Sequence, residues 1–268
     1  MWLAPASPAF AVPSSSQVTL PFTGLLYPSG VAVDSRGDVF VADTDNARVV
    51  ELPRGSARQV TLPFTGLSNP WQVAVDPAGD VFVTDNANDP VVELPRGSTR
   101  QVTLPFTGLP FPFGVAVDRR GDVFAGDDIN SRVLELRRGS ASQVTLPVTG
   151  LSPGAVAVDQ AGDVFFADAV NNNLVAELAR GSASPVTLPF TGLLFPFGVA
   201  VDRRGDVFVA DTGHNRVLEL PHGSVSPVTL PFTGLVLPRQ VAVDSAGDVF
   251  VADTINSRVV ELPHGAVR

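Results

Sequence analysis

Short hydrophobic runs separated by polar turns recur at a fixed spacing along most of the chain. The phrase Val-Thr-Leu-Pro begins at six positions spaced 42 residues apart, which are Val18, Val60, Val102, Val144, Val186 and Val228. Repeats of about 40–45 residues are typical of propeller blades. The pattern therefore predicts a single ring of six blades from Val18 to Leu262.

Each repeat predicts four short strands. In the first repeat we expect them at Gly30–Val33, Val39–Ala42, Val49–Leu52 and Gln59–Leu62. These runs are rich in valine and are bounded by Gly, Pro, Asp or Asn, as strands commonly are. No segment has a sustained apolar period of about 3.6 residues, so no long helix is expected. The predicted fold class is all-β, a six-bladed β-propeller with four antiparallel strands per blade.

The two ends of the repeat array predict how the ring closes. The chain enters at Val18 in an outermost strand, whereas the last repeat ends with a third strand, Val259–Leu262. Pairing of the N-terminal strand with the C-terminal blade would complete that blade and remove an exposed strand edge. We therefore assign residues 18–268 to the propeller.

Residues 1–17 do not match the repeat. The segment Ala9-Phe10-Ala11 has the small-x-small form of a signal-peptidase site, but no basic residue precedes it and prolines interrupt the apolar stretch. Two interpretations stay open, the remnant of a signal peptide and a disordered leader.

Composition excludes several kinds of chemistry. The net charge of −9 argues against binding to nucleic acid or to an anionic membrane. All 18 basic residues are arginine and cysteine is absent, which excludes lysine Schiff bases, thiolate nucleophiles and thiolate metal sites. The sequence contains no uninterrupted apolar run of about 20 residues, so we expect no transmembrane helix. We expect a monomer without cofactor or metal.

Recurring aspartates favour structural turns. Asp34 and Asp43 have a counterpart in all six repeats, and calcium would need six to eight oxygens converging on one point. Asp and Asn side chains commonly bond to the backbone of tight turns. We expect such a role for Asp34, Asp43 and Asn46, with charge-assisted pairing by the arginines that follow the turn. These arginines are Arg48, Arg132, Arg216 and Arg258.

The segments Pro28–Asp34, Gly37–Asp43 and Asn46–Val49 resemble NHL repeats. The recurring Leu-Pro-Phe-Thr-Gly-Leu is also similar to the extracellular sensor domains of mycobacterial receptor serine/threonine kinases. That resemblance implies a free-standing or truncated sensor-like propeller, because no lysine is present to hold ATP phosphates. Some propellers with similar repeats are metal-dependent lyases or hydrolases with histidines at the channel, but no histidine lies on an innermost strand here.

Loops that lead from each fourth strand into the next first strand hold the candidate ligand site. We call the face formed by these loops, and by those after each second strand, the upper face. The loops carry one cation and several aromatic residues, which are Tyr27, Trp71, Phe111, Phe113, Phe195, Phe197 and Arg239. Exposed aromatics beside a concavity favour ligand or protein recognition. The alternative is that these rings pack between the blades.

The opposite, lower face is rich in arginine. Twelve of the eighteen arginines fall in its loops, among them Arg36, Arg54, Arg100 and Arg204. One hypothesis is peripheral contact with an anionic surface. The alternative is a solvated rim balanced by nearby aspartates.

These patterns favour a non-enzymatic recognition or scaffold propeller, exported from the cell, that binds a protein, peptide or cell-envelope ligand such as a glycan on its upper face. Two alternatives stay open. One is a sensor domain related to a receptor serine/threonine kinase. The other is a metal-dependent propeller lyase or hydrolase with carboxylate ligands.

Overall fold

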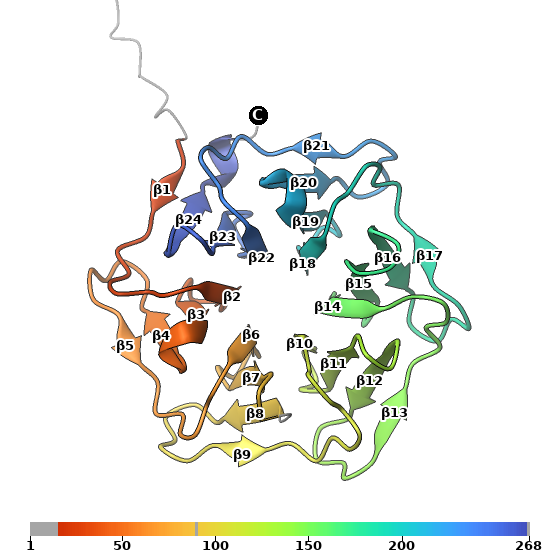
Figure 1. The fold of residues 1–268 in the computed structure, drawn as a ribbon, viewed down its shortest axis with the longest axis horizontal. Coiled ribbons are helices and arrows are strands. Elements are labelled where there is room, and N and C mark those ends of the chain that lie inside the picture. Colours follow the sequence, from red (N-terminus) through yellow and green to blue (C-terminus); the bar gives the residue numbers. More distant parts are fainter. Residues whose placement is uncertain (1–15, 89–90, 267–268) are drawn as a thin grey trace, which may run out of the picture.

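The computed structural model describes residues 16–88 and 91–266, and it shows six small sheets arranged around a central channel (Figure 1). Each sheet has four antiparallel strands. The six-bladed β-propeller predicted from the repeats is confirmed. The leader expected over residues 1–17 lies outside the described residues except for Ser16 and Gln17.

Every blade uses its four strands in the same order from the channel outward. The innermost strands are β2 (Pro28–Val33), β6 (Pro70–Val75), β10 (Gly114–Val117), β14 (Pro153–Val158), β18 (Pro196–Val201) and β22 (Pro238–Val243). The second strands are β3 (Val39–Asp43), β7 (Val81–Asp85), β11 (Val123–Asp127), β15 (Val164–Asp168), β19 (Val207–Asp211) and β23 (Val249–Asp253). The third strands are β4 (Arg48–Leu52), β8 (Val91–Leu94), β12 (Arg132–Leu136), β16 (Leu174–Leu178), β20 (Arg216–Leu220) and β24 (Arg258–Leu262). The outermost strands are β5 (Val60–Thr61), β9 (Val102–Thr103), β13 (Gln143–Thr145), β17 (Val186–Thr187), β21 (Val228–Thr229) and β1 (Val18–Thr19).

Within residues 16–88 and 91–266, helical structure is confined to three short 3-10 turns, η1 (Thr44–Asn46), η2 (Thr212–His214) and η3 (His264–Ala266). None of the described helices is long and apolar enough to cross a membrane. We number the blades from 1, which starts with β2, to 6, which contains β22, β23, β24 and β1.

The outermost strands are shorter than the sequence pattern predicts. We expected Gln59–Leu62, whereas β5 covers Val60–Thr61. The Leu62 amide still donates to the Val49 carbonyl at 2.9 Å, but Pro63 has no amide hydrogen with which to continue the ladder.

Ring closure occurs as predicted, because β1 pairs with β24 in the sheet of blade 6. Val18 lies opposite Glu261 and Thr19 opposite Val260. The first strand, β1, and the last strand, β24, therefore lie side by side in blade 6 (Figure 1).

Glutamine side chains clamp neighbouring blades together at the rim. The Gln59 amide donates to the Thr23 carbonyl at 2.9 Å and accepts from the Thr23 amide at 2.8 Å. Gln101 and Gln143 make the same pair of bonds with the preceding blade. Gln17 repeats this clamp on Thr233, so it reinforces closure of the ring.

The hydrophobic core consists of six clusters, each shared by two adjacent blades. Between blades 1 and 2, for example, Phe40 and Val49 pack with Val73, Val83 and Val92. Second strands are buried along their whole length because both faces of each sheet contact a neighbour. Burial of this apolar area is the main source of stability, so each blade depends on both of its neighbours.

Blade 4 approaches blade 3 more closely than the repeat pattern suggests. Its entering loop is one residue shorter than the others, and a β-carbon built on Gly126 would collide with the Gly154 carbonyl oxygen. The equivalent positions in blades 1, 4, 5 and 6 hold alanine. Gly126 is therefore required by the backbone contact with blade 4, and not by its own backbone conformation.

We expect Gly126→Ala to destabilise the protein, although it restores the residue found in most repeats. The two nearest atoms are backbone oxygens, which cannot move away easily, and overpacking of this kind costs about 1–3 kcal/mol. Urea unfolding monitored by circular dichroism would measure the change. Ala210→Gly in blade 5 serves as the reciprocal control, and an unchanged or higher stability of Gly126→Ala would contradict the predicted clash.

Candidate ligand site at the upper channel mouth

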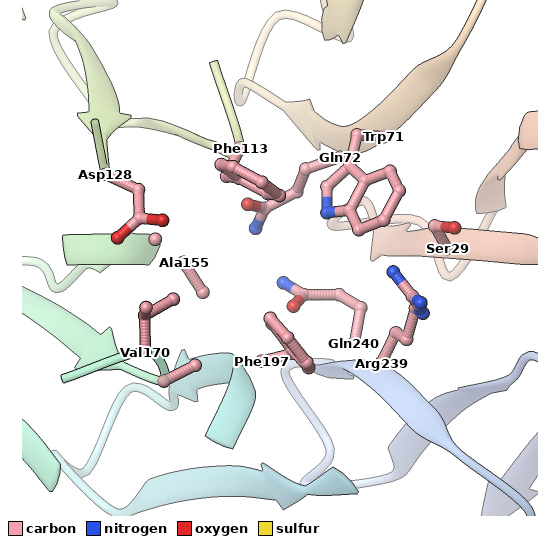
Figure 2. Close-up of a pocket in the computed structure, with 12 residues that line it drawn as sticks. Ser29, Trp71, Gln72, Phe113, Asp128, Ala155, Val170, Phe197, Arg239 and Gln240 are labelled. Carbon is pink, nitrogen blue, oxygen red and sulfur yellow. The ribbon is translucent and has the colours of Figure 1, made fainter. Parts of the chain in front are cut away.

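One residue from each blade, near the start of the innermost strand, lines the upper mouth of the channel. These six equivalent residues, which we call the mouth ring, are Ser29, Trp71, Phe113, Gly154, Phe197 and Arg239. They surround a pocket whose empty space, counted together with the part that is open to solvent, is about 390 Å³ (Figure 2). The repeats place one residue from each blade at the same level of the channel. These six positions hold five different residue types, with only phenylalanine occurring twice.

Arg239 is the cation of the pocket. Its guanidinium carbon lies 4.5 Å from the ring centroid of Trp71, 4.9 Å from that of Tyr27 and 5.5 Å from that of Phe197. One terminal nitrogen donates to the Tyr27 hydroxyl at 2.7 Å. Burial lowers the pKa of Arg239, and the interaction with Tyr27 partly opposes this effect. Aromatic faces stabilise the charge through cation–π contacts.

No carboxylate within residues 16–88 and 91–266 forms an ion pair with Arg239. Its Nε is buried and has no hydrogen-bond partner among these residues. A buried charged donor without a partner is costly, so this side of the pocket is suited to an anionic group.

Aromatic rings form two further walls. Trp71 and Phe113 meet edge to face, with centroids 5.5 Å apart. Phe197 stacks on Phe195 with centroids 6.4 Å apart. All three wall residues, Trp71, Phe113 and Phe197, are partly exposed to the pocket.

The next residue of each innermost strand forms a second set of equivalent positions, of which Gln72, Ala155 and Gln240 line the pocket. In chain order these residues are Gly30, Gln72, Gly114, Ala155, Gly198 and Gln240. Glycine in every second blade makes room for its neighbour, because a β-carbon on Gly198 would meet the Gln240 side chain at 2.7 Å. Figure 2 shows the amide ends of Gln72 and Gln240 directed toward the pocket.

The amide orientation of Gln72 follows from its hydrogen bond. Its Oε1 accepts from the Val115 amide at 3.1 Å, so its NH₂ group remains available to donate to a ligand. Both glutamines are buried, each with 5% of its surface exposed. Buried amides of this kind are the polar groups that orient ligands in otherwise apolar pockets.

A third set of equivalent positions follows the second strands and divides the mouth into two halves. In blades 1, 5 and 6 it is threonine, whose hydroxyl donates to the next blade's proline carbonyl: Thr44 to Pro70, Thr212 to Pro238 and Thr254 to Pro28, at 2.8, 2.6 and 2.8 Å. In blades 2, 3 and 4 it is Asn86, Asp128 and Ala169. The half of the mouth formed by blades 2–4 has therefore lost these interblade bonds.

Blade 4 carries a small residue in each of the three sets, namely Gly154, Ala155 and Ala169. Blade 4 therefore lines the pocket with these small residues and with Val170. The sequence signal was the shortened loop of this repeat.

The structure brings four of the seven predicted ligand residues to the pocket, Trp71, Phe113, Phe197 and Arg239. Tyr27 lies behind Arg239 and supports it. Phe111 and Phe195 are about half exposed and do not line the pocket. Both have a φ of +51°, and this left-handed backbone turns their side chains away from the strand alternation.

Turns beneath the mouth hold the entering loops in place. The buried Asp43 carboxylate accepts from the Leu26 amide at 2.7 Å, the Asn46 side chain at 2.8 Å and Arg48 Nε at 2.6 Å. Arg132, Arg216 and Arg258 pair in the same way with the aspartate of their own blade. At the lower face, Asp34 accepts from the amides of Arg36 and Asp38 at 2.8 and 2.9 Å.

Sequence reasoning missed Ser29, Gln72, Asp128, Ala155 and Gln240. Aligning the six repeats column by column would have revealed the glutamines, which stand where other repeats have Gly or Ala, and Asp128, which stands where half of them have Thr. The lower face holds most of the arginines. Arg36, Arg137 and Arg204 form ion pairs with nearby carboxylates, which reduces its free positive charge.

Among the described residues, no group of three or more His, Cys, Asp or Glu is placed to hold a metal ion. The three histidines are far from converging. His214 lies in an upper-face turn at 3.0 Å from Asp211, while His222 and His264 contact lower-face turns.

Comparison with solved structures gives strong fold similarity at low identity. A streptogramin B lyase is 14% identical with a TM-score of 0.70, covering 92% of this chain and 96% of that one. Virginiamycin B lyase from Staphylococcus aureus is 16% identical with a TM-score of 0.65, covering 92% and 87%. A nidogen/laminin complex gives 20% identity and a TM-score of 0.68, covering 76% and 79%. At these identities the similarity shows the fold alone.

No curated protein sequence matches the chain at a significant level. The NHL-repeat family model matches residues 25–52 and 193–220, which are parts of blades 1 and 5. Together with the six-bladed ring, these two matches support an NHL-type β-propeller.

Proposed function

We propose that this protein is a non-enzymatic recognition module that binds a protein, peptide or cell-envelope glycan at the upper channel mouth. The observation that carries the proposal is the mouth ring. The strands below it repeat with little change, yet its six equivalent positions hold serine, tryptophan, phenylalanine, glycine, phenylalanine and arginine. Uniform blades are sufficient to build the ring fold, so divergence at the mouth points to a use beyond folding.

The pocket has the composition of a ligand site. Its walls are aromatic and carry a few converging polar groups, which is the usual lining of a small-ligand pocket. Arginine and tryptophan are also the residues most enriched at the centres of protein interfaces. The pocket could therefore hold a free ligand or the projecting end of a larger partner.

The proposal extends to an exported protein that acts as an extracellular sensor or scaffold. Its support is the Ala9-Phe10-Ala11 motif and the sequence likeness to kinase sensor domains. The lyase alternative draws its support from the fold shared with streptogramin B and virginiamycin B lyases. It receives no support from the pocket lining, which contains no histidine and one carboxylate, Asp128.

Trp71 offers a direct test because the chain has two tryptophans. In a Trp2→Phe background, Trp71 fluorescence reports on the pocket wall alone. We would titrate this protein with a set of synthetic peptides and a set of peptidoglycan fragments. We expect a ligand that changes the fluorescence saturably.

A blocking variant identifies the site. Ala155→Gln fills the blade 4 side of the pocket with glutamine, the residue that blades 2 and 6 already carry at the equivalent position. The blade before each of blades 2, 4 and 6 has glycine there, so the larger side chain has room. We expect this variant to fold normally and to lose binding, whereas the exposed lower-face variant Arg100→Gln keeps it. Ligands that bind Ala155→Gln as tightly as the parent would refute the upper mouth as the site.

A further inference from the structure

Two charges of opposite sign lie on different walls of the same pocket, and neither has a partner of opposite charge among the residues that the structure describes. Arg239 comes from blade 6 and Asp128 from blade 3, and both line the cavity on opposite sides of the channel (Figure 2). They form no ion pair with each other or with another residue in the described part of the chain. The pocket is therefore electrically polarised across its width.

Asp128, like Arg239, differs from the residues at the equivalent positions of the other blades. Asp128 replaces the threonine that bridges blades elsewhere, so a carboxylate has been placed where a structural hydroxyl would stabilise the ring. Burial, together with the charges of Asp168 and Asp127, raises the pKa of Asp128. Those two aspartates have partners of their own, since Asp127 pairs with Arg132 and Asp168 accepts from Asn172.

No described residue supplies a cation to Asp128 or an anion to Arg239. A bound ligand would therefore supply these opposite charges. Arginine presents several donors in a fixed fork that matches a carboxylate. An ammonium group satisfies a half-buried carboxylate with up to three hydrogen bonds. Between the two charges lie the Gln72 amide and the rings of Phe113 and Phe197, which suit a polar linkage with an apolar or aromatic side group.

We propose that the ligand of this pocket is a small zwitterion of the peptide type, whose carboxylate faces Arg239 and whose ammonium group faces Asp128. This inference rests on the proposed function of the upper mouth. It narrows the ligand class from any protein, peptide or glycan to a molecule that carries both charges within the pocket, such as a short free peptide.

Four forms of one dipeptide test the inference. The probes are phenylalanyl-glycine with both ends free, with an acetylated amino end, with an amidated carboxyl end, and with both ends blocked. Isothermal titration to Trp2→Phe protein measures each Kd. We expect the free dipeptide to bind at least about 10-fold more tightly than either singly blocked form, which corresponds to about 1.4 kcal/mol.

Variants assign each end to its wall. In Asp128→Asn, acetylation should no longer weaken binding, because the ammonium has lost its partner. In Arg239→Gln, amidation should no longer weaken binding. Arg239→Lys keeps the charge without the fork, and Arg100→Gln on the lower face controls for net charge. Thermal melts of all variants exclude loss of fold as the cause.

The outcomes separate this inference from the proposed function. If all four probes bind equally and Ala155→Gln abolishes binding, the upper mouth is a ligand site but the zwitterion inference is wrong. If none binds at millimolar concentration while a glycan or larger partner binds and is blocked by Ala155→Gln, the inference is likewise wrong. If the free dipeptide binds best in both parent and Ala155→Gln protein, the charges act elsewhere and both proposals fail.

Discussion

Deletion of Val18–Phe22 is expected to destabilise the whole ring, not only blade 6. The segment provides the outer strand of that blade, and its Leu20 amide donates to the Val259 carbonyl at 3.0 Å. Leu20 and Phe22 also pack against the core cluster shared by blades 6 and 1. Removing the segment therefore breaks the contact through which the first and last blades hold each other.

The expected loss is large relative to the stability of a protein. About three ladder hydrogen bonds at about 1 kcal/mol each and two partly buried apolar side chains at about 1 kcal/mol each give roughly 5 kcal/mol. Folded proteins are typically stable by only about 5–15 kcal/mol. The deletion also exposes the edge of β24, whose Val259 and Val260 are fully buried in the intact ring, and open edges promote aggregation.

A circular permutant provides the matched control. In this permutant the chain starts at Thr23, and Arg268 is joined directly to Gln17. The new connection, Pro263–Arg268, then has the same length as Pro53–Arg58, which leads to the equivalent glutamine, Gln59, in blade 1. This permutant keeps every residue from Gln17 to Arg268, so we expect it to melt near the parent temperature. The deletion should melt lower by about 10 °C or more, given about 2–4 °C per kcal/mol. A deletion that melts like the parent would refute the closure.

The fold could be predicted because it is encoded six times over. Each repeat carries the same turn residues and the same valine-rich strands, so local ambiguity in one copy is resolved by the others. Ring closure could be predicted from Val18 and Leu262. The repeats begin with an outer strand that has no blade and end with a blade that has no outer strand, so pairing of the two completes the ring. The spacing alone implied a ring of six blades, and the resemblance to NHL repeats indicated the type of blade.

The candidate site was predicted only in part, and the reason is physical. Aromatic residues and Arg239 are conspicuous in loops, which drew attention to the upper face. Gln72 and Asp128 reach the pocket through the fold, Gln72 from an innermost strand and Asp128 from the turn after a second strand. Nothing local distinguishes Asp128 from the many turn aspartates. Its isolation from arginine becomes visible only when the partners of Asp127 and Asp168 are known.

Phe111 shows the converse limit. It is two residues from Phe113, so a regular strand would place both side chains on one side. The left-handed φ of Phe111, adopted before a proline, breaks this alternation. Sequence alone gives no reliable sign of that conformation for a phenylalanine.

Replacement of Asp43 by alanine is expected to be the most destabilising single substitution in blade 1. Its carboxylate is fully buried and joins three parts of the upper face: the entering loop through Leu26, the turn through Asn46 and the third strand through Arg48. Removing one partner of a buried charged pair costs about 3–5 kcal/mol. The loss should also reach the pocket, because Leu26 precedes Tyr27, which supports Arg239.

Asp43→Ala, Asp43→Asn and Asp45→Ala would be compared by urea unfolding and by Trp71 fluorescence in the Trp2→Phe background. Asp43→Asn keeps an acceptor for the Leu26 amide while losing the charge, so its cost should lie between those of the other two. Asp45 is exposed two residues away, and its replacement should change stability by no more than about 0.5 kcal/mol. Equal stability of Asp43→Ala and Asp45→Ala would show that the buried carboxylate does not organise the upper loops. A stability loss without any change in Trp71 emission would show instead that the turn supports the blade but not the pocket.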